Sequence, residues 1–122
     1  MKKAAVVLVM LAVALALLSA QAINLGSFPL GKWLDPNWGA YWEFSTNNIR
    51  ILDKDGNVYF DFGKATIKDF KVSAATEGVV MSFSCDETGK TYKLTKPLTN
   101  LNIILEIDRP SQEHYKVEMQ KQ

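Results

Sequence analysis

The stretch VVMSFSCDETGKTYKLTK, residues 79–96, decides the fold. Apolar side chains recur at every second position from Val79 to Cys85, and Tyr92 and Leu94 resume the alternation after residues 86–89. A period of two is typical of a β-strand with one buried face. Gly89 supplies the left-handed residue that a tight hairpin turn needs. The stretch therefore predicts two antiparallel strands, with Cys85 buried and inert on the apolar face.

Similar segments continue on both sides of this hairpin, separated by Gly, Asn, Asp and Pro, and none sustains a helical period for three turns. Gly56 predicts a second tight turn at residues 53–56. An irregular lead, residues 23–30, comes before the first strand. The expected strands are residues 31–34, 40–44, 48–52, 57–62, 66–73, 79–85, 91–96, 102–108 and 114–120.

This pattern predicts an all-β fold, and specifically a single antiparallel up-and-down β-barrel of about eight strands. Closure of the barrel removes the exposed edges that an open sheet of this size presents. A two-sheet sandwich is the main alternative. A barrel of about eight strands is either filled by side chains or holds one small ligand, and the sequence leaves both states open. The phases predict this interior: Trp42, Phe44, Ile49, Ile51, Val58, Phe60, Phe62, Phe70, Val72, Val79, Met81, Phe83, Tyr92, Leu94, Ile103, Leu105, Ile107, Tyr115, Val117 and Met119.

Residues 1–22 have the pattern of a secretory signal peptide. Lys2 and Lys3 precede an apolar run over residues 4–18, which ends at the small-residue site Ala20-Gln21-Ala22. The run is shorter than the roughly 20 residues that a transmembrane helix needs. We expect cleavage before Ile23, leaving one small β-barrel domain, residues 23–122, that is periplasmic or secreted and has no membrane span.

Composition excludes several classes of function for this domain. Removing Lys2 and Lys3 from the 14 basic residues leaves 12 against 13 acidic ones, so no basic face for nucleic acid is expected. Cys85 is the single cysteine, so no disulfide forms within the chain and stability depends on packing. About 100 residues suffice for one such core.

The densest local signal is aromatic. Trp33, Trp38, Tyr41 and Trp42 lie around the turn Asp35-Pro36-Asn37. Aromatic faces stack on ligands or line an apolar cavity, and they also serve as large core pieces. We take these four residues as the candidate ligand-binding site. Trp38 lies in the turn rather than on a strand, so it is expected to be exposed.

No catalytic constellation is evident, and the sequence predicts a protein that is not an enzyme. His114 is the single histidine and lies out of phase with the apolar residues of its strand, so it is expected to point to solvent. No nucleophile-elbow pattern accompanies it. One histidine and one cysteine do not make a zinc site. We expect no catalytic residue, no metal and no cofactor.

Gly31-Lys32-Trp33, followed by a meander of hairpins, resembles the Gly-x-Trp start of lipocalin-like (calycin) barrels. The compact bacterial members, among them periplasmic metalloprotease inhibitors, are nearest in size. The resemblance implies that Trp33 closes one barrel end under an arginine from the far end of the chain, for which Arg109 is the expected residue. The chain departs from the family in lacking the second lipocalin signature and a disulfide. Residues 33–35, 50–53 and 105–110 are also similar to small exported bacterial proteins, a likeness that implies no activity.

Two functions of different classes fit these observations. The first is an exported binding protein that holds a small hydrophobic or amphipathic ligand at the Trp-rich barrel end. The second is a protein-interaction module, such as an inhibitor of an exported protease, in which the lead, residues 23–30, or the Trp38 turn inserts into the partner. An envelope protein with a filled core and a structural role is a third possibility.

Overall fold

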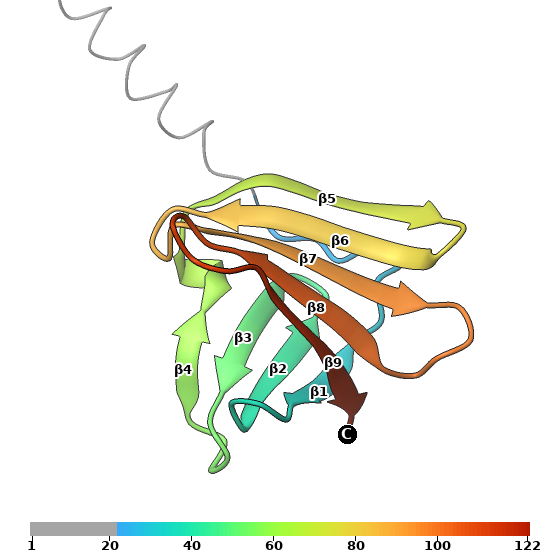
Figure 1. Ribbon diagram of the computed structural model, residues 1–122, viewed down its shortest axis with the longest axis horizontal. Coiled ribbons are helices and arrows are strands. Elements are labelled where there is room, and N and C mark those ends of the chain that lie inside the picture. Colours follow the sequence, from blue (N-terminus) through green and yellow to red (C-terminus); the bar gives the residue numbers. More distant parts are fainter. Residues whose placement is uncertain (1–21) are drawn as a thin grey trace, which may run out of the picture.

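The computed structural model describes residues 22–122, which form nine strands and one short 3-10 helix (Figure 1). The predicted strands are confirmed, and their ends differ by at most two residues from those observed. The elements are β1 (Gly31–Asp35), β2 (Ala40–Ser45), β3 (Asn48–Leu52), β4 (Val58–Asp61), η1 (Phe62–Lys64), β5 (Ile67–Ala75), β6 (Gly78–Cys85), β7 (Lys90–Pro97), β8 (Ile103–Asp108) and β9 (Tyr115–Lys121).

All nine strands belong to one antiparallel sheet in the order β4-β3-β2-β1-β9-β8-β7-β6-β5. The β1–β4 meander and the β5–β9 meander are joined where β1 pairs with β9, through Trp33 opposite Lys121 and Leu34 opposite Gln120. Figure 1 shows the β5–β9 part running across the top of the molecule and the β1–β4 part crossing below it. The sheet thus curls into a half-barrel, and the two-sheet sandwich is wrong.

The predicted closure of the barrel is also wrong. Among residues 22–122, β4 and β5 are the two ends of the strand order and do not pair. The chain between them forms η1, whose first residue, Phe62, is fully buried. Both edges are nevertheless poor templates for a further strand. β4 has only four residues, and β5 is interrupted at Asp69, where φ is 55° and the register with β6 shifts.

The two hairpin turns read from the sequence form as predicted. Gly56 and Gly89 have φ of 85° and 65°, the left-handed region that glycine occupies without strain. Their flanking strands, β3 with β4 and β6 with β7, pair antiparallel. Cys85, at the end of β6, is 1% exposed, so its predicted burial is confirmed.

Aromatic rings form the centre of the core. Phe62 contacts Trp42, Phe83 and Tyr92 at ring-centroid distances of 5.6, 5.3 and 5.2 Å. Most of the predicted interior is found inside. The buried members are Trp42, Phe44, Ile49, Phe62, Met81, Phe83, Tyr92, Leu94, Ile103, Leu105, Val117 and Met119, and Ile51, Phe60, Phe70, Val72, Val79, Ile107 and Tyr115 pack against them half-buried.

Val58 is the exception, because it is 49% exposed rather than interior. The ladder between β3 and β4 shifts between Ile51 and Leu52, so that Ile51 faces Phe60 while Leu52 faces Val58. An extra residue in one strand resets the face to which the following side chains point. Leu52 is 4% exposed, a burial that the simple alternation of β3 does not predict.

The lead is irregular as expected, but its predicted availability to a partner is wrong. Ile23, Leu25 and Phe28 are 7%, 0% and 2% exposed and belong to the core. Phe28 meets Phe44 edge-on at 5.4 Å, and the Leu25 amide donates to the Thr46 carbonyl at 3.0 Å. Burial of these three apolar side chains stabilises the lead against the sheet by roughly 1.5–3 kcal/mol each.

The signal-peptide prediction concerns residues 1–22, of which only the last lies within the described residues. Over residues 22–122, the structure holds no helix whose length and apolar character would let it cross a bilayer. The described domain begins with the lead and ends directly after β9.

Candidate functional site

A groove of about 400 Å³ opens at one end of the half-barrel. It lies between the β1–β2 and β3–β4 turns on one side and the start of β7, the end of β8 and the start of β9 on the other. A volume of 300–1,000 Å³ is typical of small-molecule sites. The lining residues are Asp35, Trp38, Gly39, Ala40, Trp42, Ile51, Leu52, Asp53, Tyr59, Lys90, Leu105, Ile107, Arg109 and Tyr115.

The inner part of the groove is apolar because it is the exposed margin of the core. Trp42 is 3% exposed and packs on Tyr92 at 5.8 Å, while Leu105 is fully buried. Ile51 and Ile107 are half-buried and belong to the same packed set. An apolar group placed here displaces water mainly from Ile51 and Ile107, which favours binding by roughly 25 cal/mol per Å² of apolar surface covered.

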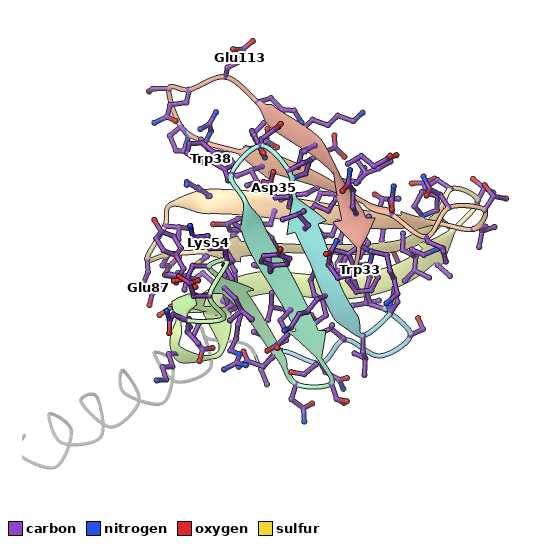
Figure 2. All side chains as sticks on the ribbon, turned by 90° about the horizontal axis from the view of Figure 1, so that it is seen from below. Trp33, Asp35, Trp38, Lys54, Glu87 and Glu113 are labelled. Atoms are coloured by element: carbon purple, nitrogen blue, oxygen red, sulfur yellow. The ribbon has the colours of Figure 1, made fainter. Side chains whose placement is uncertain are left out.

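Two exposed aromatic side chains border the groove. Trp38, in the β1–β2 turn, is 73% exposed, as the sequence predicts, and Tyr59, on the edge strand β4, is 80% exposed. Figure 2 shows Trp38 beside Asp35 at the tip of the β1–β2 hairpin. Large aromatic faces held in water at the mouth of an apolar groove are suited to close over a bound molecule.

The β1–β2 turn is tied to β9 by a buried carboxylate. Asp35 is 3% exposed; its Oδ2 accepts from the Tyr115 hydroxyl at 2.7 Å and its Oδ1 from the Asn37 amide at 2.9 Å. Burial, together with donation to Asp35, raises the pKa of Tyr115 to about 12. The phenol therefore stays protonated near neutral pH and holds Trp38's turn at a fixed place on the groove.

The four predicted ligand-binding residues are not all brought to one site. Trp38 and Trp42 line the groove, whereas Trp33 and Tyr41 are not among its lining residues. Trp33 is 1% exposed, and Figure 2 shows it well away from Trp38. Tyr41 is half-buried and, by the strand alternation, lies on the face of β2 opposite to Trp42.

Trp33 is covered by a lysine and not by the arginine that the resemblance implies. The Lys121 ammonium lies 4.3 Å from the Trp33 ring, and the indole N–H donates to the Leu101 carbonyl at 2.9 Å. Arg109 instead lines the groove and donates from Nη2 to the Glu113 carbonyl at 2.8 Å. The expected pairing of Arg109 with Trp33 is wrong, because the last strand ends beside Trp33 and the turn that carries Arg109 does not.

The charged residues that line the groove were not predicted as site residues from the sequence. Lys90 is two residues before Tyr92, and Arg109 is two residues after Ile107. Because alternate residues of a strand face the same side, both are expected to point inward like Tyr92 and Ile107. That signal was present in the sequence, but the predicted strands stopped at residues 91 and 108. Asp35 carried a similar signal, since it follows Trp33 in phase.

The single histidine lies on the surface, as predicted, within a group of carboxylates. His114 Nδ1 lies 2.5 Å from Asp108 Oδ1, and its Nε2 lies 3.3 Å from Glu106 Oε1. The bond to Asp108, with a smaller contribution from Glu106, raises the pKa of His114. No group of three or more histidine, cysteine, aspartate or glutamate side chains in residues 22–122 is arranged to hold a metal ion.

Comparison of the chain with protein-family models, with curated proteins and with solved structures finds no match. The functional argument therefore depends on the groove and on the residues that surround it.

Proposed function

We propose that this protein is an exported, non-enzymatic binding protein, built like a lipocalin, that holds one small hydrophobic or amphipathic ligand in the groove. The observation that supports this function best is the combination of an apolar inner wall with two exposed aromatic side chains, Trp38 and Tyr59, at a groove of about 400 Å³. Such concave, largely apolar sites with a few polar groups are the usual form of small-molecule sites.

The test is the binding of a neutral apolar dye, N-phenyl-1-naphthylamine, followed by its displacement with 1-dodecanol. We expect one molecule of dye per chain, with fluorescence that falls as dodecanol is added. Trp38→Ala and Tyr59→Ala each remove one aromatic contact, worth about 1 kcal/mol, so each should weaken binding about fivefold.

Leu98→Ala is the matched control. Leu98 is 75% exposed and is not a groove residue, so its truncation should leave dye affinity unchanged. The proposal fails if the dye does not bind, or if it binds equally well to a Trp38→Ala/Tyr59→Ala double variant.

The same two side chains support a second candidate, a protein-interaction module. Exposed aromatic residues are enriched among the side chains that dominate protein interfaces. The buried lead does not provide the insertion segment, so the Trp38 turn is the contact that this alternative requires. It predicts an exported protein that co-purifies with the wild-type chain and is lost on Trp38→Ala, while dodecanol does not compete.

A further inference from the structure

The first observation is that the pairing of β7 with β8 places two cations side by side at the groove. Tyr92 faces Ile107 and Thr91 faces Asp108, so one further step of the same register sets Lys90 opposite Arg109. Both side chains line the groove and both are half-buried. Like charges directly opposite one another across a sheet repel and destabilise the pairing.

The second observation is that neither cation is neutralised. No salt bridge among residues 22–122 includes Lys90 or Arg109. Arg109 donates only to a backbone carbonyl, that of Glu113, and its Nε is buried with no hydrogen-bond partner in the described chain. A buried donor without an acceptor costs about 1–3 kcal/mol, which an additional acceptor recovers.

The acidic residues of the groove are engaged elsewhere. Both oxygens of Asp35 accept hydrogen bonds, from Tyr115 and from Asn37. Asp53 Oδ1 accepts from the amides of Asp55 and Asn57, each at 2.9 Å. The Asn57 amide is the main cause of the lowered pKa of Asp53. These carboxylates stabilise the two turns and form no salt bridge with Lys90 or Arg109.

The third observation is a change of character along β7 and β8. From the strand ends inward, the facing pairs change from Lys90 with Arg109, to Tyr92 with Ile107, to Leu94 with Leu105. Of these residues, Lys90, Arg109, Ile107 and Leu105 line the groove, which is thus cationic at the strand ends and apolar beside the half-buried Ile107. A molecule that matches this order has an anionic group at one end and an apolar chain at the other.

We propose that the ligand of the groove is an anionic amphiphile whose head group lies between Lys90 and Arg109 and whose chain lies against Ile107, Ile51 and the edge of Trp42. This inference rests on the proposed binding function and names its ligand class. A guanidinium with an adjacent ammonium suits a carboxylate as well as a phosphate ester. Fatty acids and phosphate-bearing lipids share this chemistry, and the experiment separates them.

The experiment is displacement of N-phenyl-1-naphthylamine by four dodecyl compounds below their micelle concentrations at pH 7.5: dodecanoate, dodecyl phosphate, 1-dodecanol and dodecyltrimethylammonium. We expect the better anion to bind at least about tenfold more tightly than dodecanol, because a charge-assisted hydrogen bond is worth that much or more. The cation should bind most weakly. The preference between dodecanoate and dodecyl phosphate identifies the source of the head group.

Three variants locate the head group. Lys90→Gln and Arg109→Gln should each reduce the affinity for the anions about five- to tenfold while leaving dodecanol affinity unchanged. Lys93→Gln is the matched control, because Lys93 is exposed on β7 and lies outside the groove. Raising the salt concentration should weaken the binding of the anions and not that of dodecanol.

The outcomes separate this inference from the function on which it rests. Equal affinity for dodecanol and both anions overturns the anionic ligand but leaves an apolar-ligand groove intact. Loss of dodecanol binding in Lys90→Gln or Arg109→Gln assigns these residues to maintaining the groove, which also overturns the inference. If none of the four compounds displaces the dye and the dye itself does not bind, the proposed function fails together with the inference.

Discussion

The two ends of the half-barrel differ in what covers them. At the plugged end, the lead residues Ile23, Leu25 and Phe28 cover the inner face of the sheet, and Phe28 and Trp33 both pack edge-on against Phe44. At the open end, along the same inner face of β2, Trp42 borders the groove instead. The inner face of β2 therefore packs against the lead at Phe44 and borders the groove at Trp42, two residues away.

In this incompletely closed sheet, a separate segment can cover an end of the core. Within residues 22–122, the lead is such a segment at the plugged end, and the open end has none. At the open end, hydrogen bonds instead hold the turns in place around an apolar surface, above all the bond from the Tyr115 hydroxyl to Asp35. Apolar packing should therefore dominate stability at the plugged end, and individual hydrogen bonds and charges should matter more at the open end.

The largest expected effect on stability comes from replacing the aromatic residue Phe28 at the plugged end, compared with Trp38 at the open end. Phe28→Ala removes a ring that is 2% exposed, so it should reduce the free energy of unfolding by about 3–5 kcal/mol. Trp38→Ala removes a larger ring that is 73% exposed and should change it by less than about 0.5 kcal/mol. Urea unfolding of both variants measures the contrast. Similar losses in the two variants would show that the lead is not a plug.

The next effect concerns the polar bond of the open end. Tyr115→Phe leaves the buried Asp35 without one of its two hydrogen-bond donors. It should reduce the free energy of unfolding, measured in urea, by about 1–3 kcal/mol. Asn37 donates to the Tyr115 hydroxyl from its side chain. Asn37→Ala provides the control, because the hydrogen bond from the backbone amide of residue 37 to Asp35 persists in this variant. That variant should cost less than Tyr115→Phe. The reverse order would contradict the role assigned to the hydroxyl.

The same bond predicts a dependence on alkaline pH. The pKa of Tyr115 is about 12 in the fold against 10.0 for an ordinary tyrosine, so folding favours the protonated phenol. This contribution to stability is complete below pH 10 and is lost as the pH rises toward 12. Unfolding free energies measured across this window should fall more steeply for the wild type than for Tyr115→Phe. Parallel curves would show that Tyr115 titrates normally.

A smaller effect is expected from the cation at the plugged end. Lys121→Gln removes the ammonium above Trp33 while keeping a side chain of similar length, and should cost about 0.5–1 kcal/mol. Lys54→Gln, in the exposed β3–β4 turn, should have no measurable effect. The emission of Trp33 should also change in the first variant, best seen after Trp38 and Trp42 are replaced by phenylalanine. Equal stability of the two variants would show that the contact between Lys121 and Trp33 does not contribute to stability.

The strands were readable from the sequence because one face of each is buried, and burial imposes the period of two. Closure was not readable, because it depends on irregularities at single residues. The register shift beside Leu52 and the positive φ of Asp69 interrupt the pairing at the two strands that a closed barrel would have to join. Alternation carries no information about such local insertions.

The candidate site was partly readable for the same reason. Trp38 stood out because a tryptophan in a turn has no core to enter. Lys90 and Arg109 were not predicted as groove residues because charged residues mark the end of an apolar pattern, although their phase places them inside the groove. The lead was recognised as irregular, but its three apolar residues have no period that reveals which surface they cover.

The smallest expected effect is a titration beside the open end. His114 is hydrogen-bonded to Asp108, the residue before Arg109. The charged form of His114 therefore stabilises the connection between β8 and β9, which carries Arg109. Hydrogen bonding to Asp108 raises the pKa of His114 above its ordinary value of 6.5. The stabilisation is therefore complete below pH 6.5 and is lost as the pH rises through the higher, folded-state pKa. NMR titration of the imidazole should give this raised pKa in the wild type and a lower one in Asp108→Asn, with a smaller decrease in Glu106→Gln. A wild-type pKa at or below 6.5 would mean that the connection lacks this stabilisation, and that Arg109 is positioned by its bond to Glu113 alone.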